Sequence, residues 1–163
     1  NGGMLMIDTR DAHLASPGQP GPNTRALRRL VANLDLPPLA PVHADHVLTR
    51  TFYLLDRFPG RWTGGQIWLE EDRTLDRDDD AQDQLISDPN DGVSPVVIGS
   101  ADWAAAWAIG DDDEFILPVG RGNGYRQREM ALRTGVNVVM YAMTGNYKSD
   151  QVHVPALLER ISQ

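Results

Sequence analysis

A short polar motif, Asp8-Thr9-Arg10-Asp11, directly follows the apolar run at residues 4–7. The run has the uniform apolar character of a strand buried on both faces, so we expect the motif at the carboxyl end of that strand. Ligands of open α/β sheets bind at this edge. Two carboxylates, a hydroxyl and a guanidinium could position a water, a cation or an anionic substrate there. The structural alternative is a turn in which Arg10 pairs with a nearby carboxylate and Asp8 or Thr9 bonds backbone amides.

Histidine is the second residue type here that suits acid–base chemistry. His46 follows Asp45, which we expect to cap a short helical turn, and the imidazole could serve as a general acid/base near Asp8. The alternative for His46 is a local cap or a surface residue. The spacing of His43 and His46 would suit a metal only on one helical face, and Ala40-Pro41 disfavours helix at His43. We therefore predict no metal site.

A glycine-rich segment at residues 120–124 opens the longest predicted helix, 125–144. Backbone amides at a helix start, with Arg126 and Arg128 beside them, would suit an anion. The G-x-G-x-G spacing, however, is neither a dinucleotide fingerprint nor a P-loop, and no acidic residue lies about 20 positions further on. We favour a flexible turn for this segment, and we predict no cofactor.

The helix predicted at 125–144 carries polar residues at steps of three or four. On an exposed helix such a stripe would be the solvent-facing side. Asn137 and Tyr141, however, lie within an apolar run, where a polar side chain needs a partner. We favour a structural tie at Asn137 over the wall of a cleft.

The region 72–92 is acidic, contains eight aspartates and lacks hydrophobic periodicity. Its Asp76-x-Asp78-x-Asp80 spacing is that of the first ligands in a calcium loop. The glycine and the glutamate that such a loop needs at its sixth and twelfth positions are replaced by Ala81 and Ser87. We therefore predict an acidic surface loop.

Strands and helices alternate along the chain, which predicts the α/β class. We expect strands at 4–7, 66–70, 95–98 and 115–119. We expect helices from Asn23, as the capping residue, to Pro37, over 103–107 after a capping Asp102, over 125–144, and from Pro155 onward.

Composition excludes several classes of function. The 163 residues contain no cysteine, which excludes disulfides, thiolate metal sites and a cysteine nucleophile within this chain. The net charge of −8 argues against nucleic acid as a partner. No apolar run approaches the roughly 20 residues of a membrane span, so we expect no membrane insertion by this segment.

Seven stretches together resemble one known family: NGGMLMIDTR (1–10), HVLTRTFYLL (46–55), NDGVSPVVIGS (90–100), ADWAAAWA (101–108), RQREM (126–130), 137–147 and 150–160. They are similar to domain-of-unknown-function family 4159. This is an uncharacterised domain at the C-terminus of large bacterial proteins whose N-terminal region has BatA-like membrane segments.

The resemblance implies a class I glutamine amidotransferase-like, flavodoxin-like fold, a three-layer α/β architecture with a mostly parallel sheet. It also implies that the first strands lie upstream of Asn1, so that 1–163 is a single, N-terminally truncated domain with an exposed sheet edge open to homo-oligomers. Asp8 falls at or next to the place of the cysteine nucleophile of active amidotransferases. Because an aspartate cannot replace that thiol, amidotransferase activity is not expected.

We therefore expect a catalytically silent domain that acts as a ligand-binding or protein-interaction module. Its partners would be other regions of a membrane-anchored bacterial parent protein, or a separate protein. The expected binding residues are Asp8, Thr9, Arg10, Asp11, Asp102 and Arg126. The alternative is a hydrolase that uses Asp8 or Asp11 with His46 as acid/base, on a glycan-type substrate.

Overall fold

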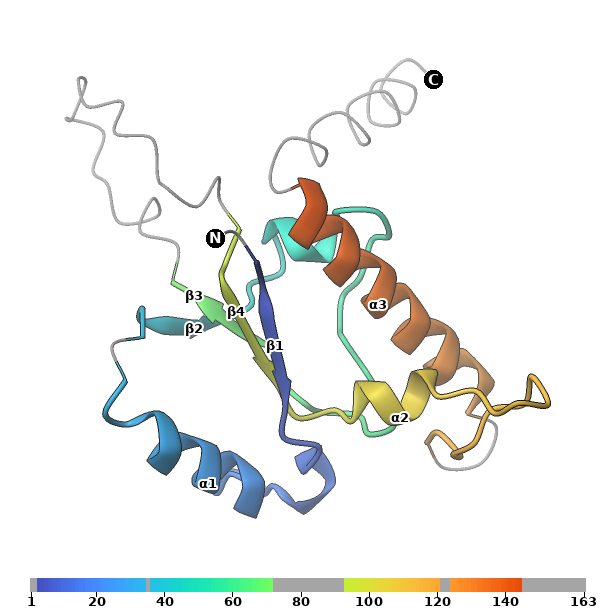
Figure 1. Ribbon diagram of the computed structural model, residues 1–163, viewed down its shortest axis with the longest axis horizontal. Coiled ribbons are helices and arrows are strands. Elements are labelled where there is room, and N and C mark those ends of the chain that lie inside the picture. Colours follow the sequence, from blue (N-terminus) through green and yellow to red (C-terminus); the bar gives the residue numbers. More distant parts are fainter. Residues whose placement is uncertain (1–2, 35, 72–92, 121–123, 145–163) are drawn as a thin grey trace.

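The computed structural model describes residues 3–34, 36–71, 93–120 and 124–144, in which strands and helices alternate (Figure 1). The strands are β1 (Leu5–Asp8), β2 (Leu39–Pro41), β3 (Trp68–Glu70) and β4 (Val96–Gly99). The α-helices are α1 (Pro22–Val31), α2 (Trp103–Trp107) and α3 (Tyr125–Thr144), and two 3-10 turns are η1 (Ala12–Leu14) and η2 (Val47–Thr49). The predicted α/β class is confirmed.

The four strands form one open sheet in the order β1-β4-β3-β2. β1 and β4 are parallel, with Leu5 opposite Val96 and Asp8 opposite Gly99. β3 runs antiparallel to both β4 and β2. The described sheet is therefore mixed, and the expected mostly parallel arrangement is not confirmed. The difference from the prediction is the orientation of β3, which is antiparallel to its neighbours. A parallel β3 would need a crossover connection to the neighbouring strand.

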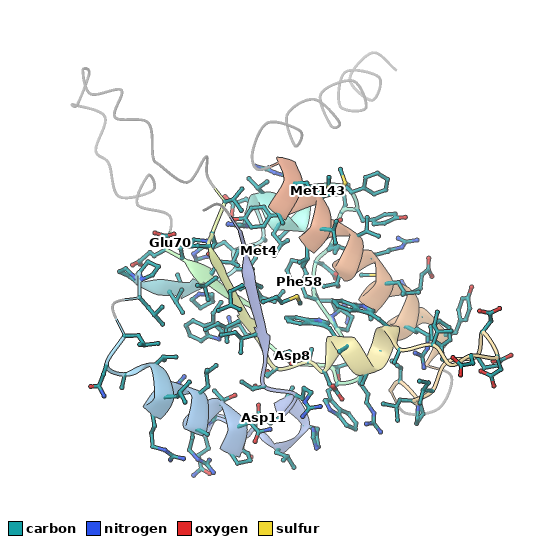
Figure 2. All side chains as sticks on the ribbon, viewed as in Figure 1. Met4, Asp8, Asp11, Phe58, Glu70 and Met143 are labelled. Carbon is teal, nitrogen blue, oxygen red and sulfur yellow. The ribbon has the colours of Figure 1, made fainter. Side chains whose placement is uncertain are left out.

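One face of the sheet is closed by a continuous core. Figure 1 shows α2 and α3 on one side of the sheet and α1 on the other. The core contains Trp103 of α2 and Val138 and Tyr141 of α3, and Met4 and Met6 pack against it. Figure 2 places Phe58, a further core residue, in the layer between β1 and α3. Burial of this apolar surface is the main stabilising term of the fold.

The opposite face is only partly covered. Helix α1 has no buried residue, and its Leu30 is 74% exposed. Leu5, which alternates with Met4 and Met6 along the strand, is 58% exposed. The sheet is therefore closed by helices on one side and left open on the side of α1.

Helix α3 is tied to the loop before β3 by a buried polar side chain. The Oδ1 atom of Asn137, a residue with 0% exposure, accepts from Tyr53 N at 2.8 Å, while its Nδ2 donates to the carbonyls of Leu48 (2.8 Å) and Tyr53 (2.9 Å). Tyr141 also has a partner, because its hydroxyl accepts from Ser94 N at 2.7 Å. The structural tie predicted at Asn137 is confirmed.

The first helix begins and ends elsewhere than predicted. Pro22 lies in the first turn of α1 and Gly21 is its N-terminal flanking residue, so Asn23 is not the cap. Proline suits this turn because it has no N–H to satisfy. The helix ends at Val31, well before Pro37.

Two further element predictions differ from the structure. The strand predicted at 115–119 is absent, and only an isolated bridge joins Ile109 to Phe115, since Pro118 has no N–H to donate to a ladder. Strand β2, which has only three residues, is not among the strands that we predicted from the sequence.

The predicted acidic loop at 72–92 and the predicted helix from Pro155 lie outside the described residues. Among the helices of the described ranges, none is long and apolar enough to cross a membrane.

Asn137→Leu should destabilise the fold by about 3 kcal/mol, because it leaves one backbone N–H and two carbonyls buried without their partner. The free energy of unfolding at pH 7, from urea titration, measures this loss. The matched control is Asn33→Leu at an exposed position, where we expect a change within about 0.5 kcal/mol. Equal losses in the two variants would contradict the tie.

Candidate functional site

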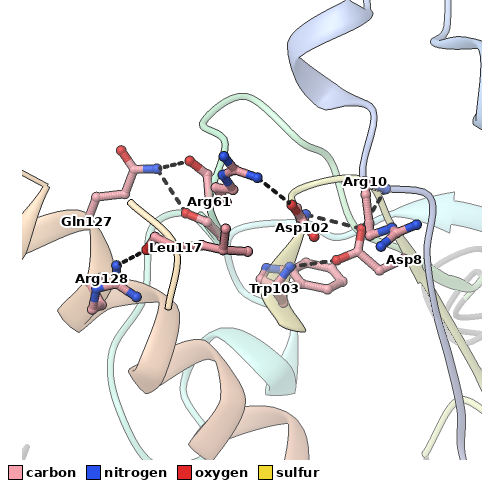
Figure 3. Close-up of polar contacts among 9 residues, drawn as sticks. Asp8, Arg10, Arg61, Asp102, Trp103, Leu117, Gln127 and Arg128 are labelled. Atoms are coloured by element: carbon pink, nitrogen blue, oxygen red, sulfur yellow. Dashed lines mark hydrogen bonds and ion pairs between the residues drawn. The ribbon is translucent and has the colours of Figure 1, made fainter. Parts of the chain in front are cut away.

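The carboxylate of Asp8, the last residue of β1, is held by backbone amides from two segments of the chain (Figure 3). Its Oδ1 accepts from Arg10 N at 3.0 Å and from Asp102 N at 3.2 Å, and its Oδ2 accepts from Trp103 N at 2.6 Å. Asp8, at the end of β1, therefore supplies the hydrogen-bond acceptor that caps the start of α2. Asp102 occupies the N-cap position, as predicted, but its own side chain makes no cap hydrogen bond.

Two residues bonded to Asp8 have left-handed backbone. The φ angles are 59° at Arg10 and 61° at Asp102. Residues other than glycine rarely adopt this conformation, although aspartate does so more readily than arginine. In both residues the amide N–H donates to the same oxygen, Oδ1 of Asp8. The carboxylate thus offsets the cost of two turns that meet at the sheet edge.

Asp11 forms a second, more deeply buried network. The residue is 1% exposed, and its carboxylate accepts from the Thr9 hydroxyl at 2.5 Å. It also accepts from the amide and from the hydroxyl of Thr24, both at 2.9 Å. Burial alone would raise the Asp11 pKa, but these hydrogen bonds outweigh it and hold the pKa below its ordinary value. A Cβ at Gly21 would lie 2.1 Å from Asp11 Oδ2, so this approach requires glycine. Asp11 thereby anchors the start of α1 to the end of β1.

Asp102 is electrostatically different. It is 7% exposed, and burial followed by the negative charge of Asp8 raises its pKa. The positive charges of Arg10 and Arg61 oppose that shift, and Arg61 Nη1 lies 3.9 Å from Asp102 Oδ2. The strand end therefore holds two neighbouring carboxylates, and burial together with the charge of Asp8 disfavours ionisation of Asp102.

A groove of about 430 Å³ lies between the end of β1 and helix α1. Three of the predicted residues, Asp8, Thr9 and Arg10, contribute to it. The other lining residues are Ile7, Asn23, Ala26, Leu27 and Leu30. Because Asp8 and Thr9 already hydrogen-bond within the chain, the groove offers mainly an apolar wall and the exposed Arg10.

The structure does not bring His46 to the groove. Its ring lies 5.7 Å from that of Tyr141, whose hydroxyl bonds Ser94 ahead of β4. Asp8 lies opposite Gly99 at the other end of β4. His46, not Asp45, caps η2, because its Nδ1 accepts from Leu48 N at 3.1 Å.

Arg126 is also absent from the residues that line the groove. It is exposed in the first turn of α3. Its neighbours hold that turn in place. Gln127 donates to the carbonyls of Gly60 and Arg61, and Arg128 donates to that of Leu117 (Figure 3). Arg128 also donates to the carbonyl of Ala106. Residues 121–123, in the middle of the glycine-rich segment for which we favour a flexible turn, lie outside the described residues.

Several residues at the strand end were not identified from sequence. Thr24, Leu27 and Leu30 come from α1, a helix that the sequence predicts without indicating its position beside the motif. Arg61 reaches Asp102 from a loop with no recognisable signal. Within the described ranges, no three histidine, aspartate or glutamate side chains are grouped as metal ligands.

Asp8→Asn should destabilise the protein by about 2 kcal/mol, because the amide keeps one acceptor oxygen for three backbone donors. It should also lower the Asp102 pKa, since the charge of Asp8 is one cause of the raised value. Urea unfolding and carboxyl ¹³C shifts during a pH titration measure the two effects. An unchanged Asp102 pKa would show that Asp8 is not coupled to it.

Asp11→Asn and Asp102→Asn should change stability at pH 7 in opposite directions. The pKa of Asp11 is lowered in the folded state. The negative charge of Asp11 therefore stabilises the fold above pH 3.8, and this stabilisation is lost as the pH falls through the folded pKa. The pKa of Asp102 is raised in the folded state. The contribution of Asp102 to the stability of the fold is therefore present below pH 3.8 and is lost as the pH rises through the folded pKa. Asparagine also tolerates the left-handed backbone at position 102.

We therefore expect a lower melting temperature for Asp11→Asn and a higher one for Asp102→Asn at pH 7, measured by calorimetry. Both differences from the unsubstituted chain should shrink as the pH approaches 3. Destabilisation of the same size in both variants would contradict the assigned charge states.

Comparison with known proteins identifies one family. The description of that family is "domain of unknown function (DUF4159)", and the match spans residues 1–143, from the segment before β1 almost to the end of α3. No curated protein shows significant similarity to the chain. Since the match covers the strand-end motif and most of the sequence, the chain belongs to the DUF4159 family.

Proposed function

We propose that this domain is a protein-interaction module without amidotransferase activity, and that its contact surface is the groove between β1 and α1. The observation that supports this most strongly is a contrast within the groove region. Its carboxylates are used in hydrogen bonds within the chain, whereas its apolar side chains remain exposed.

The carboxylates are poorly suited to catalysis as they stand. Asp8 accepts three backbone hydrogen bonds, and Asp11 is buried and accepts three more from Thr9 and Thr24. A nucleophile or a general base must instead reach the substrate with a free lone pair. The chain also has no cysteine for the position that the amidotransferase resemblance assigns to Asp8.

The apolar surface, in contrast, lacks a cover among the described residues. Leu30 and Leu34 continue the stripe of Leu27 and are 74% and 58% exposed. β1 is the outermost strand of the described sheet beside β4, and its Leu5 is 58% exposed. Contiguous exposed apolar side chains beside a free strand edge are typical of a protein contact.

The charges around the groove favour an acidic partner. Arg10 lines the groove, and α1 carries Arg25, Arg28 and Arg29 without any acidic residue. The whole chain has a net charge of −8, so this basic surface stands out from the rest. A segment with both apolar and acidic side chains would match the groove and its rim.

The family resemblance supplies the proposed context. In it, the sheet belongs to an amidotransferase-like, flavodoxin-like domain, and the partner is another region of a membrane-anchored bacterial protein. The parallel β1–β4 pair, with helices on both sides of the sheet, supports that relationship. The hydrolase alternative gains no support, because Asp8 and His46 lie at opposite ends of β4.

Leu30→Cys provides the test, because a chain without cysteine gains a unique thiol in the groove. We expect this thiol to react with maleimide at least tenfold more slowly in the intact parent protein than in the isolated domain. Leu54→Cys, 69% exposed and outside the groove, is the control and should react equally in both. Labelling is measured by mass spectrometry.

The acidic character of the partner requires a second variant. Adding Arg28→Glu and Arg29→Glu to Leu30→Cys should restore fast labelling in the parent protein, because the reversed charges repel an acidic segment. Equal labelling of Leu30→Cys in both samples would refute the interaction surface. Protection that survives the charge reversal would refute the acidic partner.

A further inference from the structure

Helix α3 has a second apolar surface on the side away from the core. Its buried residues include Ala131, Val138 and Tyr141. Four other side chains form an exposed stripe: Leu132 (40% exposed), Val136 (39%), Val139 (56%) and Met143 (76%). Figure 2 labels Met143 near the C-terminal end of the helix. We call these four residues the α3 stripe.

The composition around the α3 stripe is unusual for a solvent-facing helix surface. Such a surface is normally rich in charged residues. All the charged residues of α3 lie at or before Arg133, and none occurs between Thr134 and Thr144. On a chain with a net charge of −8, an exposed helix face without charged side chains is typical of a contact surface.

The spacing of the α3 stripe indicates a helix as its partner. The four positions are separated by four, three and four residues, as in the seam of a left-handed coiled coil. The sizes of the side chains are also symmetric along the stripe, because the larger Leu132 and Met143 lie on either side of Val136 and Val139. A two-fold axis between the valines would place Val136 opposite Val139 of a second copy, and Leu132 opposite its Met143.

We propose that the α3 stripe pairs with the α3 stripe of a second copy of this chain, with the two helices antiparallel. A self-complementary surface is what a two-fold dimer requires. The antiparallel arrangement opposes the two helix dipoles favourably. Because the stripe carries no charge, two acidic chains can meet there without placing like charges in contact.

A groove beside the α3 stripe offers space for side chains of the second copy. It has a volume of about 350 Å³ and is lined by Trp107, Leu132, Gly135, Val136, Val139 and Met140. The absence of a side chain at Gly135 keeps it open, since a Cβ there would lie 3.2 Å from the Trp107 ring. The small residue also lets a second helix approach closely.

The size of the α3 stripe predicts a weak dimer. Four exposed side chains per copy bury less than the roughly 800 Å² per partner of a standard stable interface. We therefore expect association in the micromolar range, detectable by sedimentation over a wide concentration series. This dimer does not depend on the groove between β1 and α1, which lies across the sheet from α3.

The first test compares the full chain with Val139→Asp by sedimentation equilibrium. We expect a monomer–dimer equilibrium in the unsubstituted chain and a dissociation constant at least tenfold larger in the variant, because a charge would be buried between the helices. Val139 is 56% exposed, so the substitution spares the core, which circular dichroism checks. Leu14→Asp, at a 57% exposed position outside α3, is the matched control and should dimerise normally.

The second test uses the absence of cysteine to determine the helix orientation. Chains with Val136→Cys are mixed with chains with Val139→Cys under mild oxidation. Antiparallel helices should give mainly the mixed disulfide between the two variants. Parallel helices would give the two homodisulfides instead and would overturn the proposal.

Three other outcomes would overturn it. One is a chain that remains monomeric at millimolar concentration, as it would if another segment of the same chain covered the α3 stripe. Another is a dimer that Leu14→Asp weakens as much as Val139→Asp does. The third is a dimer that Leu30→Asp dissociates and Val139→Asp does not, which would assign self-association to the groove of the proposed function.

Discussion

The fold depends on one electrostatic junction at the sheet edge, the half-buried carboxylate of Asp8. Two residues with left-handed backbone, Arg10 and Asp102, and the first residue of α2, Trp103, donate backbone N–H groups to it. Without that acceptor, the amides of Arg10, Asp102 and Trp103 would lose their common partner at the sheet edge. This side chain helps to fix the position of α2, and with it the Trp103 ring in the core, together with the hydrogen bond from Trp103 Nε1 to the Phe58 carbonyl.

The same junction explains why the polar motif is not free to do chemistry. The site combines aspartate, threonine and arginine at the carboxyl end of a parallel strand, the usual place for a ligand. Here the acceptor capacity of Asp8 and Asp11 is spent on positioning α2 and α1. The carboxylates hold the walls of the groove in place, and the exposed side chains of Arg10 and Leu30 form its contact surface. A carboxylate that stabilises a fold in this way leaves recognition to its neighbours.

Sequence patterns predicted the parts of this fold that local physics determines. The apolar run before Asp8 and the long periodicity of α3 identify β1 and the helix because burial itself requires those patterns. The patterns do not report which distant segments meet. His46 and Asp8 each suit acid–base chemistry, yet they lie at opposite ends of β4, and the orientation of β3 depends on a chain path that no short motif records.

The two surfaces of the domain differ in charge for a physical reason. An acidic chain repels its own copies, so a stable contact between copies needs a surface without net charge, which the C-terminal half of α3 provides. A contact with a different, acidic segment instead benefits from positive charge, which Arg10 and the arginines of α1 supply. The sheet lies between these two surfaces, so occupation of one leaves the other accessible. A dimer through α3 would therefore present two grooves, and two acidic segments linked to one another would bind both with a higher apparent affinity without any new contact.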